Sequence, residues 1–367
     1  MFTHQSKNKK KVFVGLSGGV DSAVSAALLK RSGYDVTGVF IRIVLPGYPC
    51  PATADRQDAM RVAAHLRIPF HEIDLSKEYY DKVFSYTLAE FAKGHTPNPD
   101  TLCNREIKFG LFFEYAMAQG ADKVATGHYA QLQKTARGVE MYTSVDQEKD
   151  QSYFLWMIES RQFQRILFPV GDKNKSTVRK LAAKFSLPNA HRKDSQGLCF
   201  LGDISMDDML MRELHPARGA VIDEQGDIVG DHAGVKLYTF GQRHGFTITG
   251  SVQKEKKPQF VVAKDIERNT ITVSYDSFPK HATKTKVHLT DTNGLSPVLS
   301  GSYQARYRYR QKLIPATLVC EAEKAVVILH APFYVPIGQS LVLYTHTEIR
   351  GALQCVGGGV VEKTELL

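Results

Sequence analysis

Short apolar runs and longer amphipathic segments alternate through the first half of the chain. The run Val12–Leu16 is rich in β-branched residues and is typical of a strand buried on both faces. The next segment has helical spacing, with Val24, Ala27 and Leu28 on one face, and Gly33 provides a stop signal. Two more strands are predicted over 35–44 and 70–75, and a helix over 54–68 ends before Pro69.

The same alternation continues to about residue 187. Helices are predicted over 77–94, 104–120 and 176–187, and a strand with a polar tip over 123–130. Ser176 is the expected N-cap of the last helix, and Pro188 follows its end. This order predicts a doubly wound α/β domain, whose ligand should lie beyond the carboxyl ends of its strands, where residues 17–22 and 127–128 fall.

Beyond about Gly202 the pattern changes character. A hairpin-like turn is predicted at Gln225–Gly226, and short β-branched runs recur from residue 259 onward, as in small all-β units. We therefore expect three domains: an α/β domain over 1–205, a small middle domain over 206–282, and a β-rich, barrel-like domain over 283–367.

The length and composition of the chain limit the class of protein to which it can belong. Its 367 residues suit two or three domains, and no apolar run approaches the roughly 18 residues that a membrane span needs. We expect a cytoplasmic protein with no membrane partner. The five cysteines are an odd number without any CxxC pair, which argues against a disulfide framework and against a structural zinc site. No protein metal site is predicted, and Cys50, Cys320 and Cys355 are interpreted as small buried hydrophobes.

The charge favours a polyanionic partner. The formal net charge is +9 and basic clusters occur at 191–194, 254–257 and 305–312. The last cluster alternates arginine with tyrosine, which predicts a strand with Arg306, Arg308 and Arg310 on one face and Tyr307 and Tyr309 on the other. Two interpretations stay open for it: a solvated basic face, or a surface that pairs phosphates and stacks bases of RNA.

The segment SGGVDS, residues 17–22, joins the first strand to the first helix. Unpaired backbone N–H groups and the helix dipole make such a junction suitable for a phosphate, which Gly18 and Gly19 would let approach the main chain. The segment is neither the GxxxxGK[ST] loop nor a GxGxxG loop. The alternative is an ordinary turn capped by serine and aspartate. The segment resembles the SGG-x-DS signature of the PP-loop ATP pyrophosphatases, which cleave ATP between its α and β phosphates.

Two other cysteines stand in segments that we expect to be loops. Cys103 follows the proline-rich stretch 94–102 and precedes a predicted helix, with Arg105 and Lys108 close in sequence, a setting that favours a thiolate. The alternative for Cys103 is a small buried hydrophobe. Cys199 follows Ser195 and Gly197 in the stretch KDSQGLCFLGD.

A resemblance to one family covers nearly the whole chain. GLSGGVDS, TPNPDTLCNREIKF, TGHYA, KDQSYFL, FPVG, KDSQGLCFLG, YTFGQRHG, RYRQ and GQS…GGG stand here in the order of the bacterial tRNA-specific 2-thiouridylase family. The resemblance implies a PP-loop domain of the adenine nucleotide alpha hydrolase type. It also implies replacement of the C2 oxygen of the wobble uridine by sulfur, with ATP consumed and AMP and pyrophosphate released.

The resemblance also assigns roles to residues. ATP, together with Mg²⁺, would be held by Gly15, Leu16, Ser17, Gly18, Gly19, Val20, Asp21, Ser22, Ile41 and Gly127. Cys199 would carry a persulfide received from a sulfur-relay protein or cysteine desulfurase, and Cys103 would be the nucleophile that closes a transient disulfide with it. Asp100 lies near enough to Cys103 in sequence to serve as a proton acceptor or donor.

A further set of residues would contact tRNA, with the acceptors for glutamate, glutamine and lysine as substrates of a monomeric enzyme. This set is Asn98, Pro99, Asp100, His128, Lys149, Asp150, Gln151, Arg308, Tyr309 and Gln339. Asp150 has a second interpretation, as a helix N-cap. The chain departs from the family pattern at 42–52, so the resemblance defines the adenine-side contacts less well than the phosphate loop. It matches the family only loosely at 204–216, so no contact with a sulfur donor is assigned there. Two alternatives remain: another PP-loop enzyme, which would not need Cys199, and an RNA-binding protein that has lost catalysis.

Overall fold

The computed structural model describes residues 9–48, 52–193, 200, 202, 204–249, 258–276, 278–279, 282–294, 300–321, 324–349 and 351–367. They form two compact units. The α/β unit comprises Met1–Lys82, Asp100–Asp203 and Thr347–Val356, and the β-rich unit comprises Val83–Pro99, Ile204–His346 and Gly357–Leu367. Cys50 and Cys199, with Ser195 and Gly197, lie outside the described residues. Cys355 is buried as predicted, whereas Cys320 is exposed, so the prediction of a buried hydrophobe is wrong for Cys320. Within the described residues, no helix has both the length and the apolar character that crossing a membrane requires.

A five-stranded parallel sheet forms the centre of the α/β unit. Its order is β3 (Phe70–Asp74), β2 (Asp35–Arg42), β1 (Lys11–Gly15), β4 (Lys123–Ala125) and β7 (Ile166–Leu167). The order reverses direction between β1 and β4, so these two strands define the topological switch point, where open α/β sheets bind ligands. The predicted doubly wound domain is confirmed.

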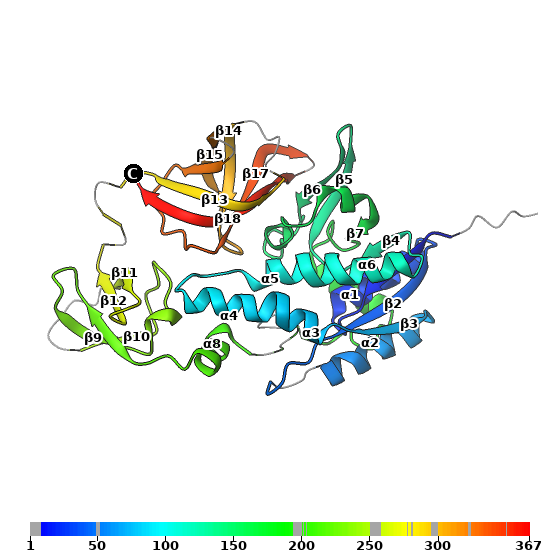
Figure 1. Cartoon of the computed structure of the whole chain (residues 1–367). Coiled ribbons are helices and arrows are strands. Elements are labelled where there is room, and N and C mark those ends of the chain that lie inside the picture. The colour runs from blue at the N-terminus through cyan, green and yellow to red at the C-terminus, as the bar shows by residue number, and fades with distance from the viewer. Residues whose placement is uncertain are drawn as a thin grey trace, which may run out of the picture. The chain divides into compact units, whose positions relative to one another are not determined.

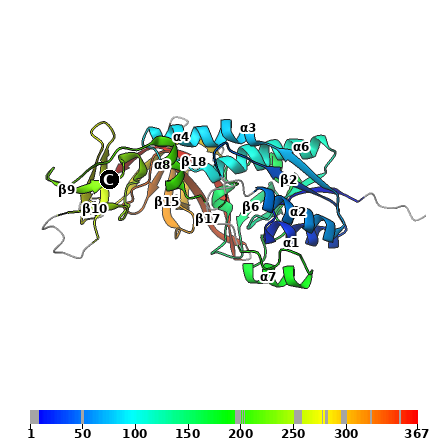
Figure 2. The same ribbon diagram turned by 90° about the horizontal axis from the view of Figure 1, so that it is seen from below.

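Helices cover both faces of this sheet. Figures 1 and 2 show α1 (Val20–Arg31) and α2 (Ala52–Leu66) on one face and α6 (Phe112–Ala118) on the other. Val12, Val14 and Val24 are fully buried in the core between β1 and α1. The other helical elements of this unit are α3 (Ser76–Tyr79), the π-helical η2 (Cys103–Leu111), the 3-10 helices η3 (Ser152–Phe154) and η4 (Ser160–Arg165), and α7 (Lys175–Lys184). The hairpin β5 (Ala130–Thr135) and β6 (Gly138–Thr143) pairs with residue Gln354 of β18.

Two predictions about helix ends are wrong. Helix α7 begins at Lys175 with Asn174 as its N-cap, so Ser176 lies inside the helix. The Asp146 carboxylate accepts the Lys175 N–H at 2.8 Å, so a distant side chain supplies the partner that a capping serine would supply. Cys103 is not in a loop: α5 (Pro99–Leu102) runs directly into η2, and Cys103 is its first residue.

The β-rich unit begins with the helical η1 (Tyr80–Phe84) at its boundary and α4 (Ser85–Ala92), and continues with α8 (Met206–Leu214). A five-stranded sheet has the order β10 (Phe246–Ile248), β9 (Ile228–His232), β8 (Gly219–Ile222), β12 (Thr270–Ser274) and β11 (Phe260–Asp265), with η5 (Val235–Leu237) beside it. The turn at Gln225–Gly226 joins β8 to β9 as an antiparallel hairpin, as predicted.

A closed barrel of six strands completes this unit. The strands follow in the order β13 (Thr285–Asn293), β16 (Lys324–Leu329), β15 (Ile314–Glu321), β14 (Gly301–Arg306), β17 (Ser340–Ile349) and β18 (Ala352–Leu366), and β18 pairs back with β13. They are the yellow to red arrows of Figure 1. The barrel confirms the prediction of a β-rich, barrel-like C-terminal part, while the domain boundaries at 205/206 and 282/283 stay predictions.

The arginine–tyrosine strand prediction is wrong. Strand β14 ends at Arg306, and the chain then turns because Gln311 Oε1 accepts the N–H groups of Tyr307 and Arg308 at 2.9 and 3.2 Å. Arg306 is 5% exposed with its guanidinium 5.3 Å from the centre of the Tyr344 ring, whereas Arg308 is exposed. The arginines therefore do not share one solvated face.

Candidate active site

Hydrogen bonds of two serines, Ser17 and Ser22, hold the backbone of the loop between β1 and α1. Ser22 Oγ accepts the Ser17 N–H at 3.2 Å and donates to the Gly19 carbonyl at 3.0 Å. Ser17 Oγ accepts the Gly19 N–H at 3.3 Å. Helix α1 has no side-chain N-cap, since its N-cap residue is Gly19. The first turn of α1 thus begins directly behind a compact loop, which is the geometry expected of an anion site.

Close approaches explain two glycines of the predicted nucleotide set. Gly18 has φ +77°, and a Cβ there would lie 2.5 Å from the Asp55 carbonyl oxygen. A Cβ on Gly127 would lie 2.7 Å from Ser22 N and 2.8 Å from the Asp21 carbonyl carbon. The residues after β1 and after β4 therefore touch at the switch point, as their positions in the sequence predicted. Ile41, the third nucleotide-side position, is buried near the end of β2.

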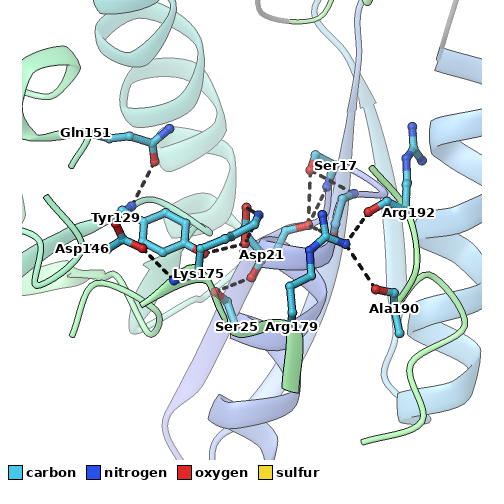
Figure 3. Close-up of polar contacts among 12 residues, drawn as sticks. Ser17, Asp21, Ser25, Tyr129, Asp146, Gln151, Lys175, Arg179, Ala190 and Arg192 are labelled. Atoms are coloured by element: carbon cyan, nitrogen blue, oxygen red, sulfur yellow. Dashed lines mark hydrogen bonds and ion pairs between the residues drawn. The ribbon is translucent and has the colours of Figure 1, made fainter. Parts of the chain in front are cut away.

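Asp21 is the centre of a charged cluster (Figure 3). Its two carboxylate oxygens each accept a hydrogen bond from Lys175 Nζ at 2.8 Å, and Tyr129 Oη donates to Asp21 Oδ1 at 2.8 Å. The side chains of Asp21 and Lys175 are 29% and 16% exposed, so the ion pair is only partly accessible to water. Lys175 and Tyr129 were not predicted as site residues. Lys175 lies 154 residues from Asp21, and no motif spacing in the sequence connects the two. Tyr129 was recognised only as part of the predicted strand over 123–130.

A second cationic group lies at the other side of the loop. Arg192 Nη1 donates to Asp58 Oδ2 at 2.7 Å and Arg192 also pairs with Asp55, both on α2. A Cβ on Gly18 would come within 3.0 Å of the Arg192 guanidinium. Asn189 Nδ2 donates to the Gly18 carbonyl at 2.7 Å. Figure 3 shows Arg179 and Arg192 on the side of the loop opposite Lys175. The loop is therefore flanked by cations on both sides.

His128, a predicted tRNA contact, is a buried residue. It is 8% exposed, and its Nδ1 lies 2.7 Å from Thr126 Oγ1. Its ring packs against Phe109 and Phe168 with centroids 5.8 and 5.9 Å apart. Burial, with the nearby charge of Lys108 as a smaller cause, lowers the pKa of His128 well below its ordinary value of 6.5. The imidazole is accordingly neutral at physiological pH.

The stretch 149–151 combines one buried and two half-buried side chains. Asp150 is 1% exposed, and its carboxylate accepts the N–H groups of Ser144 and Ser152 at 3.0 and 3.2 Å. Asp150 thus caps the backbone just before η3, although the N-cap position itself is Gln151. Gln151 Oε1 accepts the N–H of Tyr129 at 3.0 Å, and Lys149 is half-buried. Through Gln151 the stretch fixes Tyr129, whose hydroxyl donates to Asp21.

Cys103 lies deep in the α/β unit. Its exposed fraction is 0%, and the next residue, Asn104, donates from Nδ2 to the Phe154 carbonyl at 3.0 Å. Lys108, one of the two cations close to it in sequence, has its Nζ 5.8 Å from the centre of the Phe200 ring. Asp100 stands in the helical turn before Cys103 and is half-buried. Burial alone is what a small hydrophobe would show, so the proposed chemistry of Cys103 depends on its sequence context.

In the β-rich unit the structure joins two predicted tRNA contacts. Asn98 Nδ2 donates to Gln339 Oε1 at 3.2 Å, across 241 residues of sequence. Pro99 is the first residue of α5. Arg308 is exposed, with its guanidinium 5.5 Å from the centre of the Tyr307 ring, and Tyr309 is half-buried under Arg310. The turn 307–311 therefore offers a cation at the surface.

Comparison with known proteins identifies full-length relatives. Family models match three successive parts of the chain: the tRNA methyl transferase HUP domain at 10–203, the tRNA methyl transferase PRC-barrel domain at 207–275, and the aminomethyltransferase beta-barrel domain at 281–361. The tRNA-specific 2-thiouridylase MnmA of Enterococcus faecalis is 40% identical over 97% of this chain and 96% of its own length.

Two streptococcal relatives agree with this match. The tRNA-specific 2-thiouridylase of Streptococcus equi subsp. zooepidemicus is 40% identical over 99% of this chain and 97% of its own length. That of Streptococcus mutans is 40% identical over 97% of this chain and 96% of its own length. Among solved structures, the NMN synthetase of Francisella tularensis is 18% identical with a TM-score of 0.35, over 55% of this chain and 72% of its own, a likeness too low to bear on function.

Proposed function

The chain belongs to the tRNA-specific 2-thiouridylase family and is a tRNA sulfurtransferase, and we propose that it exchanges the C2 oxygen of the wobble uridine for sulfur at the expense of ATP. The observation that carries this proposal is the 40% identity that runs through all three domains. The further proposal concerns which residues of this chain do the chemistry, and it is supported by the contacts around Asp21, Cys103 and Asn98.

The loop Gly15, Leu16, Ser17, Gly18, Gly19, Val20, Asp21 and Ser22, with Gly127, would hold the triphosphate of ATP. Gly18 and Gly127 leave no room for a Cβ, because the Asp55 carbonyl packs against Gly18 and the first turn of α1 packs against Gly127, so the proposed ATP loop is closely packed on both sides. Lys175 and Arg192 lie on either side of the loop, Lys175 paired with Asp21 and Arg192 paired with the α2 carboxylates. A polyanion in this place would be paired by these cations and by N–H groups at the start of α1. Lys175 is thus added to the nucleotide set, and Ile41 would lie at the adenine side.

The Asp21 carboxylate also fits Mg²⁺, since carboxylate oxygens are the ligands that this ion prefers. When bound, Mg²⁺ would neutralise charge that develops on the departing pyrophosphate. Both oxygens of Asp21 now accept from Lys175. Lys175 would therefore release one of them and pair with a phosphate oxygen instead. The chain's own contribution is to hold the α-phosphorus in reach of the uridine O2, which becomes a good leaving group once it carries AMP.

The sulfur step would use two cysteines. Cys199, outside the described residues, would carry a persulfide delivered by a sulfur-relay protein or a cysteine desulfurase, and its outer sulfur would attack C2 of the uridine. AMP leaves from C2 as the C–S bond forms. Cys103 would attack the inner sulfur of the persulfide, so that the outer sulfur remains on the uridine and a Cys103–Cys199 disulfide forms, which a thiol reductant must reopen. Asp100 would accept the Cys103 proton.

Residues of both units would contact the tRNA. Asn98, Pro99 and Asp100 would contact the target base, which has to leave the anticodon stack to reach a buried cysteine. His128, Lys149, Asp150, Gln151, Arg308, Tyr309 and Gln339 are the remaining proposed tRNA positions. The burial of His128 and Asp150 favours support of the binding surface over direct contact. We propose the glutamate, glutamine and lysine tRNAs as substrates, a monomeric enzyme, and a cytoplasmic location.

The test is a thiolation assay on the whole protein. Purified protein is incubated with ATP, Mg²⁺, a persulfide source and unmodified glutamate tRNA, and thiolated RNA is detected by its retardation in a mercury-containing gel. We expect a retarded band that requires ATP. Cys199→Ser should lose the band and keep tRNA-dependent pyrophosphate release, with Cys320→Ser as the matched control. A fully active Cys199→Ser protein would refute the role of Cys199, and no band with any donor would refute the proposed product.

A further inference from the structure

Residues 93–98 connect helix α4 to the proposed target-base contacts and have no regular secondary structure. Gly94, with φ +80°, ends the helix: its N–H donates to the Phe91 carbonyl at 2.9 Å, and the N–H of His95 donates to the Glu90 carbonyl at 3.0 Å. Beyond this cap, residues 95–98 have no helix or strand to fix their direction. Their geometry must come from contacts with other parts of the β-rich unit.

On one side the segment is tied by Lys264, on strand β11. Lys264 Nζ donates to the carbonyl oxygens of Gly94 and Tyr238, each at 2.8 Å. The ammonium thus joins the C-terminal end of α4, where the helix dipole also favours a cation, to Tyr238, the first residue of the YTFGQRHG motif. It lies 5.6 Å from the centre of the Phe240 ring. Next to it, the hydroxyls of Thr96 and Thr239 are 3.3 Å apart.

The side chain of Lys264 is half-buried. Burial lowers the pKa of Lys264 to about 8. An ammonium in such a place remains stable only if its protons have acceptors, and the two carbonyls supply them. Neutral Lys264 also has two N–H bonds, so both contacts can persist above this pKa.

On the other side the segment is held by the turn that precedes β17. Thr96 N–H donates to the Ile337 carbonyl at 2.8 Å, and Asn98 Nδ2 donates to Gln339 Oε1 at 3.2 Å. Between them, Gly338 has φ +85°, and a Cβ there would lie 3.3 Å from His95 Cβ and 3.4 Å from Pro97 N. The segment is therefore clamped between the five-stranded sheet and the barrel, both in the β-rich unit.

We propose that Lys264 is a positioning residue of the thiolation reaction: it fixes the start of segment 94–98, so that Asn98 meets the target uridine in one geometry. This inference rests on the proposed role of Asn98–Asp100 as target-base contacts. Lys264 acts through Gly94 and does not touch substrate. The family motif YTFGQRHG, to which no role was assigned, thereby gains one: its Tyr238 carbonyl and Thr239 hydroxyl form one side of the clamp.

The test compares Lys264→Met with Lys264→Arg and with Lys123→Met. Methionine is unbranched and one atom shorter than lysine, and it removes the donors, whereas arginine keeps a cation able to bond two carbonyls. Lys123 is the matched control because it is also partly buried, with burial lowering its pKa, and donates to a carbonyl, that of Gln164, at 2.6 Å in the α/β unit. Thr239→Val removes the Thr96 contact with little change of shape and serves if Lys264→Met does not fold.

The first readout needs no tRNA. Hydrogen exchange of the Thr96 amide should be about 10-fold faster in Lys264→Met than in the wild-type protein, and within about threefold of wild type in Lys264→Arg and Lys123→Met. The second readout is tRNA-dependent pyrophosphate release at saturating ATP. In Lys264→Met, kcat should fall by about 10- to 100-fold with the ATP dissociation constant unchanged, because the target base is misplaced while the nucleotide loop is intact. Lys264→Arg should recover most of kcat.

Two results would overturn the inference: an unchanged Thr96 exchange rate in Lys264→Met, or faster exchange with wild-type kcat. A different result would count against the proposed function itself. If wild-type pyrophosphate release does not depend on the target uridine, the base-contact role of Asn98–Asp100 fails, while the exchange measurement still decides whether Lys264 orders the segment.

Discussion

The nucleotide loop and the segment 94–98 are both irregular stretches that precede a helix, but they are held in opposite ways. In the loop, the serine contacts that set the backbone run between residues two to five positions apart. In the segment, the contacts that orient Thr96, Gly94 and Asn98 span 143, 170 and 241 residues. The internal hydrogen bonds of the loop come from its own sequence and can be recognised there, although Asn189 also donates to the Gly18 carbonyl from 171 residues away. The segment takes its shape from two other parts of the β-rich unit.

The two regions also differ in how charge is used. Around the loop, Asp21 and Lys175 form an ion pair that a phosphate or a metal ion can rearrange. In the segment, the half-buried cation Lys264 bonds two neutral carbonyls and has no carboxylate partner in these contacts. The loop is therefore suited to bind and release a charged ligand, and the segment is suited to stay in place.

The largest effect should come from the ion pair. Asp21→Asn leaves Lys175 without its carboxylate and removes the expected Mg²⁺ ligand, so tRNA-dependent pyrophosphate release should fall by at least about 100-fold. Asp122→Asn, on an exposed carboxylate that accepts the Lys11 N–H at 2.8 Å, is the control. Release within tenfold of wild type in Asp21→Asn would remove Asp21 from the nucleotide site.

The close contact between the two strand ends provides the next test. In Gly127→Ala the new Cβ would meet Ser22 N and the Asp21 carbonyl carbon at 2.7 and 2.8 Å, so the first turn of α1 must shift. We expect ATP affinity to fall by about 10-fold and the free energy of unfolding by about 1–3 kcal/mol. Calorimetric titration and thermal unfolding measure the two. Unchanged ATP affinity would mean that the loop does not depend on residues after β4.

The clamp on the segment can be broken at Gly338. Gly338→Ala and Gly351→Ala carry the same backbone strain, since φ is +85° and +77°, but only at Gly338 would the Cβ meet neighbours, those of residues 95–97. Both variants should lose about 1 kcal/mol of stability, whereas only Gly338→Ala should lower kcat for tRNA-dependent pyrophosphate release, by about fivefold. Equal kinetics in the two variants would contradict the clamp.

His128 provides a pH test of the loop region. Its pKa in the folded protein lies well below 6.5, so the unfolded chain binds a proton that the folded one does not as the pH falls below about 6.5. The free energy of unfolding of the wild-type protein should therefore drop on acidification relative to His128→Gln, by about 1 kcal/mol at pH 5.5. Urea titrations at pH 7.5 and 5.5 measure this difference. Parallel loss in both proteins would show that His128 is not the responsible group.

The smallest effect is expected at the surface turn of the barrel. Arg308→Ala should weaken tRNA binding two- to fivefold at physiological salt and lower the slope of log affinity against log salt by about 1, since one phosphate contact is lost. Filter binding over a range of salt concentrations tests this. An unchanged slope would show that Arg308 does not pair with a phosphate.

Local patterns in the sequence determined much of this protein. The alternation of strands and helices, the loop 17–22 with Gly18, and the β-rich second half were all recognisable because hydrophobic period and glycine placement act over a few residues. The same holds for the family motifs, which are contiguous strings. The local pattern gave wrong predictions in two places: Gln311, three to four residues away, forms the turn that ends the expected arginine–tyrosine strand, and Asp146, 29 residues from Lys175, takes over the capping expected of Ser176.

Only the tertiary structure decided which distant side chains complete each site. Lys175 and Tyr129 reach Asp21 because α7 and the end of β4 converge on the start of α1. Lys264 reaches Gly94 because β11 lies beside the end of α4. No spacing in the sequence encodes these meetings. They follow from burial of the core faces of sheets and helices, which brings residues more than a hundred positions apart within hydrogen-bonding distance.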